Sequence, residues 1–325
     1  MKYLLDLATR HQIGLIILML ALGFILPHTF SVFNPYNTLF LQIIMFATGL
    51  RLDYRELFKE MRDWRTILLG TSMKLVIIPF LIMIPLSMFA PQWSLPFIIA
   101  GTMPTGLTAP ALVAILGGST SLALVISATT AALAPFTIPI VLKALIGHDV
   151  HVNTVSMMIQ IADAVLFPLL LAGITQYFVG KNRIEKVALP IRTISLVSFM
   201  LVVASITSAS AIAASKGGQS ITSIGIDGLL IATLMICFWI GVSLLAAVFL
   251  SWRDEKSRAT LTFCLIYMNY TLAIWVGDMF FREAQIAPKL VAIVILVIGI
   301  VPGFKYLFPK QKKAVGPVCM VDVHV

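Results

Sequence analysis

The sequence has little charge. Only 11% of its 325 residues are charged, whereas 59% are hydrophobic and the mean hydropathy is +1.00. Soluble globular domains usually carry about 25% charged residues. Water is therefore excluded as the main solvent of this chain. The net charge of +9 does not indicate a nucleic-acid partner, because most of the basic residues lie in the segments between apolar runs.

The sequence also lacks the motifs of catalytic and metal sites. Its three cysteines, Cys237, Cys264 and Cys319, show neither a pairing pattern nor the spacing of metal ligands, so we predict reduced thiols. There is no HExxH motif, nucleophile elbow, pair of catalytic carboxylates or Walker loop. None of the histidines lies within a predicted span. The sequence predicts neither an enzyme nor a cofactor or metal site.

Long apolar runs follow one another along the chain. A helix needs about 20 mostly apolar residues to cross a hydrocarbon core of roughly 30 Å. We predict an all-α membrane protein, a single integral membrane unit over residues 1–325, with ten transmembrane helices. The candidate spans lie near residues 13–27, 38–50, 67–89, 95–116, 119–146, 154–179, 193–214, 224–250, 259–281 and 286–308.

The positions of lysine and arginine predict the orientation, because loops rich in these residues stay in the cytoplasm. With ten spans, one side of the membrane holds the basic segments 51–65, 181–192, 253–258 and 305–313. The opposite side holds Lys143, Lys216, Arg282 and Lys289. We therefore predict a multi-pass protein of the inner (plasma) membrane of the cell, with both termini and the tail 311–325 in the cytoplasm.

Ten spans divide into two sets of five, residues 1–150 and 151–310. A five-helix unit crosses the membrane an odd number of times, so a second copy is inserted upside down, as in inverted-repeat transporters. The fourth span contains GTMPTGLTAP, in which two prolines obstruct the helix and Gly106 permits an unwound turn. The ninth contains CLIYMNYTLA, with Asn269 and Thr271 at similar depth. We predict two crossing discontinuous helices.

The predicted crossing is the expected solute-binding site, because broken backbone in a membrane must face protein or a wet cavity. The alternative is that the prolines only kink the helix. The candidate substrate-binding residues at the crossing are Thr105, Gly106, Thr108, Asn269 and Thr271.

Three stretches carry a resemblance to a known family. LQIIMFATGLRLDYRELF joins an apolar run and a Gly-Leu pair to an acidic surface helix. The run from GTMPTGLTAP to LAPFTIPIVL combines a proline-glycine crossover with a Ser/Thr-rich span that ends in two prolines, and RATLTFCLIYMNYTLAIWV would be the crossover partner. In order and spacing, the chain resembles the bile acid and sodium symporter superfamily over nearly its whole length.

The resemblance implies an architecture and a mechanism. Spans three to five and eight to ten would form a core domain, and spans one, two, six and seven would form a panel that rocks against it. The resemblance also implies transport of an organic anion, although the tenth span lacks the His-Asn pair of the family.

The departures from the family concern its two sodium sites, whose ligands are oxygen atoms, as a hard cation requires. Of the residues matching these ligands, only Ser127 and Asn269 are retained. Carboxylate, amide and hydroxyl groups have become thiol, thioether, methyl and ammonium, so we predict that neither sodium site survives. The matching positions are Lys74, Ala109, Pro110, Ala123, Ser127, Cys264, Met268 and Asn269.

Two charges lie deep within predicted spans, where charged residues are rare and usually functional. Lys74 could replace the coupling sodium, could couple transport to protons by releasing its own proton on one side, or could snorkel to the inner interface. Asp163 could pair with Lys74, bind the substrate directly or merely line the pore. The candidate ion-coupling residues are thus Lys74, Ser127, Cys264, Met268 and Asp163.

The leading hypothesis is a secondary active transporter of a small organic solute, expected to be an organic anion. It would be sodium-independent, with Lys74 in place of the coupling cation, and the positive ends of the half-helices would meet the anion. The alternatives are a sodium-coupled organic anion symporter, or a non-transporting sensor or scaffold of the same fold. The expected partners are the solute and the lipid bilayer, without nucleic acid. A monomer is compatible with the sequence, which leaves the oligomeric state open.

Overall fold

The computed structural model describes residues 12–60, 63–146, 153–215, 225–249, 252–281 and 286–306, and within these ranges it contains helices and no strand. The helices in chain order are α2 (Gln12–Ile25), α3 (Pro27–Ser31), η1 (Asn34–Tyr36), α4 (Asn37–Gly49), α5 (Tyr54–Glu60), α6 (Trp64–Ser72), η2 (Met73–Ile77), α7 (Ile78–Phe89), α8 (Pro91–Thr102), α9 (Ala109–Leu116), α10 (Thr120–Ile146), α11 (Thr154–Ile161), η3 (Ala162–Leu166), α12 (Phe167–Val179), α13 (Lys181–Lys186), α14 (Ala188–Ser215), α15 (Gly225–Val248), α16 (Glu255–Ile266), α17 (Tyr270–Phe280), α18 (Ala287–Ile300) and η6 (Val301–Tyr306).

Several of these helices are long and apolar enough to cross a membrane. In the described ranges five helices meet this criterion by themselves, and a sixth span results if α2 and the helices after it, bent by 101°, count as one. Two of the predicted spans do not meet this criterion because each is divided into two half-helices. The fourth predicted span is divided into α8 and α9, and the ninth into α16 and α17. The chain is thus an all-α, multi-pass membrane protein, and the ten-span inverted repeat stays a prediction. The five continuous spans are Trp64–Phe89, Thr120–Ile146, Thr154–Val179, Ala188–Ile212 and Gly225–Val248.

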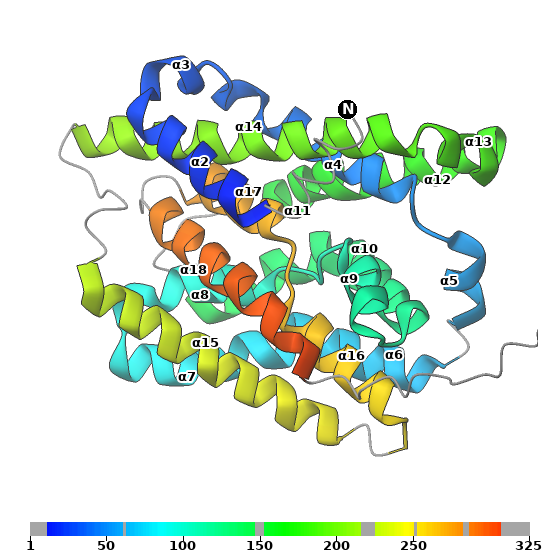
Figure 1. Cartoon of the computed structure of the whole chain (residues 1–325). Coiled ribbons are helices and arrows are strands. Elements are labelled where there is room, and N and C mark those ends of the chain that lie inside the picture. The colour runs from blue at the N-terminus through cyan, green and yellow to red at the C-terminus, as the bar shows by residue number, and fades with distance from the viewer. Residues whose placement is uncertain are drawn as a thin grey trace, which may run out of the picture.

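The helices pack in two groups (Figure 1). In the first, called the α14 group, α2, α3 and α4 lie along α14, and α12 packs on α4. The second, called the α10 group, contains α6 to α10, α15, α16 and α18. The groups meet where η3 contacts both α4 and α10 and where α17 contacts both α4 and α8. The half-helices therefore lie beside the seam between the groups.

Small residues allow the close packing within the α14 group. A Cβ atom on Gly23 of α2 would lie 2.4 Å from the carbonyl oxygen of Ala204 on α14, so only glycine fits there. The hydroxyls of Ser205 and Thr207 donate to carbonyls of the preceding turn of α14, at 3.0 and 2.7 Å. Small residues with satisfied hydroxyls are typical of tight helix contacts in membranes. These hydroxyls hence serve helix packing.

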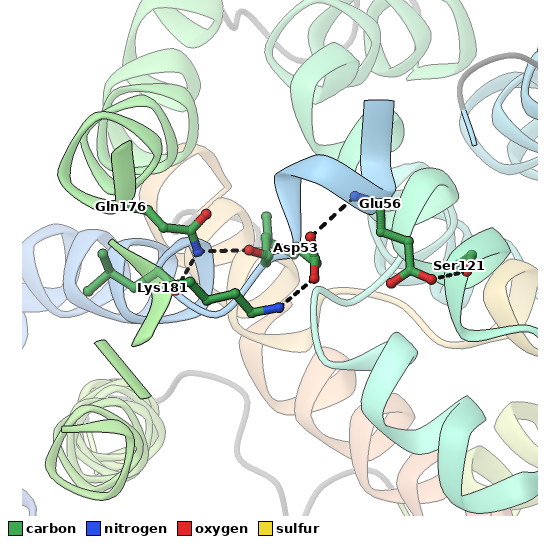
Figure 2. A network of polar contacts seen from close by, with 7 residues as sticks. Asp53, Glu56, Ser121, Gln176 and Lys181 are labelled. Carbon is green, nitrogen blue, oxygen red and sulfur yellow. Dashed lines mark hydrogen bonds and ion pairs between the residues drawn. The ribbon is translucent and has the colours of Figure 1, made fainter. Parts of the chain in front are cut away.

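A polar network ties the short surface helix α5 to both groups (Figure 2). Asp53, just before α5, forms an ion pair with Lys181 of α13 and accepts a hydrogen bond from the backbone N–H of Glu56 at 3.2 Å. The Glu56 carboxylate accepts a hydrogen bond from Ser121 of α10. The side chain of Gln176 on α12 donates to the carbonyl of Leu52 at 2.9 Å. The network thus links α12 and α13 to α10 through α5.

We predict a small, pH-dependent contribution of the Asp53–Lys181 pair to stability. The Lys181 ammonium lowers the pKa of Asp53, and the Asp53 carboxylate raises the pKa of Lys181. The contribution is therefore lost as the pH falls below about 4 or rises above about 10. Both side chains are partly exposed, so the pair is worth less than about 1 kcal/mol.

A double-mutant cycle with Asp53→Asn and Lys181→Gln, read as thermal unfolding in detergent, measures this coupling. The coupling should shrink in high salt. A coupling of several kcal/mol, or one unchanged at pH 3, would contradict this interpretation.

Candidate functional site

The first helix break follows from a proline. The helix α8 ends at Thr102, and Met103 is extended, with φ −68° and ψ 141°. The residue before a proline is driven away from helical geometry, and here Pro104 follows. The helix resumes as α9 at Ala109.

The second break has neither proline nor glycine. The helix α16 ends at Ile266, and Tyr267 and Asn269 are extended, with φ −74° and ψ 101° and with φ −76° and ψ 91°. The side chain of Asn269 then caps α17, its Oδ1 accepting from the N–H of Leu272 at 3.1 Å. Only the cap is a local signal, so the break itself must be stabilised by tertiary contacts.

The two breaks supply these contacts to each other. The N–H of Gly106 donates to the carbonyl of Tyr267 at 3.1 Å, and the N–H of Asn269 donates to the carbonyl of Pro104 at 2.8 Å. Between these bonds Thr105 and Met268 form an isolated antiparallel bridge. Each unwound segment therefore satisfies backbone groups of the other, which lipid could not do.

Gly106 is required by the closeness of this crossing. A Cβ atom at this position would lie 2.6 Å from the ring of Tyr267 and 3.0 Å from the carbonyl oxygen of Met268. Gly106 is not among the glycines with positive φ. The reason for glycine is thus close approach of two chains rather than the conformational freedom inferred from the sequence.

Buried hydroxyls fasten the crossing from the side. Thr105 Oγ1 donates to the carbonyl of Cys264 at 2.8 Å, and the Thr105 N–H donates to Thr130 Oγ1 at 3.2 Å. Ser127 Oγ donates to the carbonyl of Gly106 at 3.3 Å. The structure thus brings the candidates Thr105, Gly106, Ser127 and Cys264 together, and the hydroxyls of Thr105 and Ser127 donate to backbone carbonyls.

The remaining crossing candidates differ in access. Thr108 is exposed, and its hydroxyl lies 2.8 Å from that of the half-buried Tyr267. Asn269 and Thr271 are buried, and Asn269 Nδ2 donates to the sulfur of Met45 on α4 at 3.8 Å. Of the five substrate-binding candidates at the crossing, only Thr108 is exposed.

Lys74 lies wholly inside the protein, at the second break. Its side chain is 0% exposed, and its Nζ donates to the carbonyl of Leu265 at 2.9 Å. Leu265 belongs to the last turn of α16, where the carbonyls lack helical partners and carry the negative end of the helix dipole. This placement is incompatible with snorkelling to the interface.

Trp239 of α15 is a second partner of the amine and was missed by the sequence reasoning. Lys74 Nζ lies 5.1 Å from the centre of the Trp239 ring, within the range of cation–π attraction. The indole N–H donates to the same Leu265 carbonyl at 3.3 Å. The position of Trp239 in the middle of an apolar span could have drawn attention to it, but the sequence does not tell which charged side chain it contacts.

Both deep charges occur in π-helical turns. Lys74 lies in η2, five residues before Pro79, and Asp163 lies in η3, five residues before Pro168. A π turn bonds each N–H to the carbonyl five residues earlier, and proline has no N–H to donate. The carbonyls of both charged residues are therefore left without a helical partner.

Asp163 is far less enclosed than Lys74. Its side chain is exposed, and Gln42 of α4 donates from Nε2 to its carboxylate at 3.0 Å and to its freed carbonyl at 3.3 Å. The ion pairs between described residues are Asp53–Lys181 and Asp63–Arg253. Of the alternatives for Asp163, pairing with Lys74 is therefore wrong, because Lys74 points to the end of α16 whereas Asp163 points to α4.

The positions that match sodium ligands offer few oxygen atoms. Ala109 and Ala123 are buried methyl groups, and the buried side chains of Cys264 and Met268 carry sulfur. Sodium is a hard cation and requires oxygen ligands. In the described part of the chain, no group of three or more His, Cys, Asp or Glu residues could hold a metal ion.

A family model assigns the chain. The model described as "Sodium Bile acid symporter family" matches residues 38–216, more than half of the sequence. The chain belongs to the sodium bile acid symporter family. It is therefore a member of a transporter family.

One curated relative gives a more specific comparison. The chain is similar to the "Uncharacterized sodium-dependent transporter YocS" of Bacillus subtilis (strain 168), with 28% identity over 199 residues, which is 59% of this chain. The match spans 60% of that relative's length. The family match covers Lys74, the first break and Asp163, but it ends before Trp239 and the second break.

We predict that Gly106→Ala destabilises the protein by about 1–3 kcal/mol, because the added methyl group must displace Tyr267 or the Met268 backbone. The measurement is the thermal unfolding of the purified protein in detergent.

The matched control is Gly241→Ala in α15, where a Cβ atom meets nothing within 4 Å. This change should be neutral or stabilising, because alanine favours a helix by up to about 1 kcal/mol over glycine. Equal effects of the two changes would show that the crossing is not the cause.

Proposed function

We propose that this chain is a secondary active transporter of a small organic solute that works by alternating access without sodium. In this proposal Lys74 is a permanent substitute for the coupling cation. The observation that carries it is the buried amine on the Leu265 carbonyl, beside the paired helix breaks.

The chemistry of the amine supports this role. A buried ammonium is tolerated only where hydrogen bonds and charges compensate for lost hydration. Here the Leu265 carbonyl, the Trp239 ring and the negative end of α16 provide that compensation. A sodium ion would require several oxygen ligands at the same place, whereas a lysine brings its charge covalently and needs fewer.

The moving parts would be the two packing groups. We propose that the α14 group acts as the panel and the α10 group as the core, within ten spans that form inverted repeats over 1–150 and 151–310. Location in the inner (plasma) membrane with cytoplasmic termini is part of this proposal. The tail 311–325 lies outside the described residues.

The proposal favours a fixed charge over proton coupling. Lys74 Nζ is hydrogen-bonded to Leu265, and Asp163 is hydrogen-bonded to Gln42, so no direct contact joins the two as a relay. In the proton-coupled version, Lys74 would have to release its proton during the cycle.

A second candidate is a sodium-coupled organic anion symporter. It is favoured by the name of the Bacillus subtilis relative, which calls that protein sodium-dependent. A non-transporting sensor or scaffold is the third possibility, and it would give no flux under any gradient.

We expect uptake of solute into proteoliposomes to be unchanged when sodium is replaced by potassium at constant ionic strength. The reason is that the buried side chains at four of the ligand-matching positions carry methyl or sulfur groups instead of oxygen. The measurement is the initial rate of radiolabelled uptake. A strong dependence on sodium would reject the substituted-cation mechanism and favour the symporter.

We expect Lys74→Gln to reduce uptake by about tenfold or more, because a hydrogen bond to a charged group contributes about 1.5–3 kcal/mol and the neutral amide removes that charge. Residual uptake that becomes sensitive to sodium would strengthen the proposal.

The matched control is Lys289→Gln at the start of α18. Lys289 also donates to a carbonyl, that of Gln92 at 2.9 Å, and lies 5.7 Å from the centre of the Trp93 ring, but it is only half-buried. This variant should transport normally. Wild-type uptake by Lys74→Gln would remove the amine from the mechanism.

A further inference from the structure

The Asp163 carboxylate lies at the seam between the two groups, and none of the described residues forms an ion pair with it. The π turn η3 that carries it contacts α4 of one group and α10 of the other. The carboxylate is exposed, and its hydrogen-bond partner is the neutral amide of Gln42. A carboxylate within a span is unfavourable in lipid, so its exposed face indicates a polar path along the seam.

The local backbone adds to this negative potential. Because Pro168 has no N–H and Phe167 bonds to Ala162, the carbonyl oxygen of Asp163 is free of the helix. Gln42 Nε2 donates both to this oxygen, at 3.3 Å, and to the carboxylate, at 3.0 Å. One neutral amide therefore fixes the carboxylate, and no ion pair within the described ranges compensates its charge.

Two positive groups near the crossing, the Lys74 amine and the start of α9, are already hydrogen-bonded. The Lys74 amine is buried and hydrogen-bonded to Leu265. In the first turn of α9, the N–H of Ala109 bonds to Gly106, Pro110 has no N–H, and the N–H of Ala111 bonds to Thr108. The half-helix that was expected to attract an anion thus has no free donor in these positions.

The second half-helix is capped in part. The Asn269 side chain caps the Leu272 N–H at 3.1 Å, and the Ala273 N–H bonds to the Asn269 carbonyl at 3.0 Å. The positive end of α17 is therefore also partly neutralised by its own cap.

Aromatic rings lie next to these capped ends. Tyr267, half-buried, stacks on Phe263 with ring centres 5.1 Å apart and meets Tyr270 edge to face at 5.2 Å. The buried hydroxyl of Tyr270 has no hydrogen-bond partner among the described residues. Ring faces attract organic cations.

The helix α4 connects this aromatic group to the carboxylate. Met45 contacts Asn269, next to Tyr270, and Gln42 contacts Asp163. Gln42 and Met45 are three residues apart and hence lie on one face of α4, about one turn apart. The Asp163 carboxylate and the two tyrosines, Tyr267 and Tyr270, are therefore placed along the same face of α4 at the seam.

From this arrangement we infer that the transported solute carries a positive charge, as an ammonium or guanidinium group, which pairs with Asp163 while Gln42 holds the carboxylate in position. This inference rests on the proposed transport function and replaces the anion expected from the family resemblance.

The test uses the full-length protein in proteoliposomes and probes of both charges. Choline and agmatine are the cationic probes, and taurocholate and pyruvate are the anionic ones. We expect saturable uptake of a cationic probe, with an apparent affinity about tenfold or more weaker in Asp163→Asn. Saturable uptake of an anion without that of a cation would overturn the inference and leave the transport proposal intact. No flux of any probe would count against both.

Gln42→Leu tests the positioning role. Gln42→Leu should weaken the affinity for the cationic probe less than Asp163→Asn does. The double variant should bind the probe no more weakly than Asp163→Asn alone, because Gln42 acts only through the carboxylate. The matched control is Gln160→Leu on α11, whose amide donates to Ser156 at 2.9 Å in the neighbouring turn. Unchanged cation affinity in Asp163→Asn, with only the pH profile altered, would identify a proton site instead and overturn the inference.

Discussion

The structure depends on the backbone pairing of two interrupted helices. Within a membrane, an unwound segment has peptide groups that lipid cannot satisfy. Here each break uses the other, through the hydrogen bonds from Gly106 to Tyr267 and from Asn269 to Pro104. Close approach then requires glycine at position 106, and the end of α16 is left with carbonyl oxygens inside the protein. Those oxygens are where the buried amine finds its partner.

The two deep charges share a local device but differ in environment. Lys74 and Asp163 both precede a proline by five residues and both lie in a π turn, which frees their carbonyls from the helix. Lys74 is enclosed, and its charge is compensated by protein groups. Asp163 is exposed, and the side chain that the described part of the chain offers it is the neutral Gln42. We therefore assign a fixed structural charge to the first and solute recognition to the second, as proposals.

Membership of the sodium bile acid symporter family accounts for the architecture but leaves the chemistry of this chain open. The family match ends at residue 216, so Trp239 and the second break lie beyond it. Lys74 therefore lies within the matched residues, whereas its indole partner Trp239 lies beyond them. A family name describes the scaffold, whereas the coupling and the solute depend on the side chains placed on it.

The sequence alone determined an all-α membrane protein, because apolar runs and loop charges act independently of contacts, and it predicted the first break, because Pro104 acts on its own neighbour Met103. It also singled out Lys74 as costly in lipid. Only the tertiary structure decided the shape of the second break, the meeting of Lys74 with Trp239, and the separation of Lys74 from Asp163. These depend on which segments cross in space, and no local preference encodes a contact between residues more than a hundred positions apart.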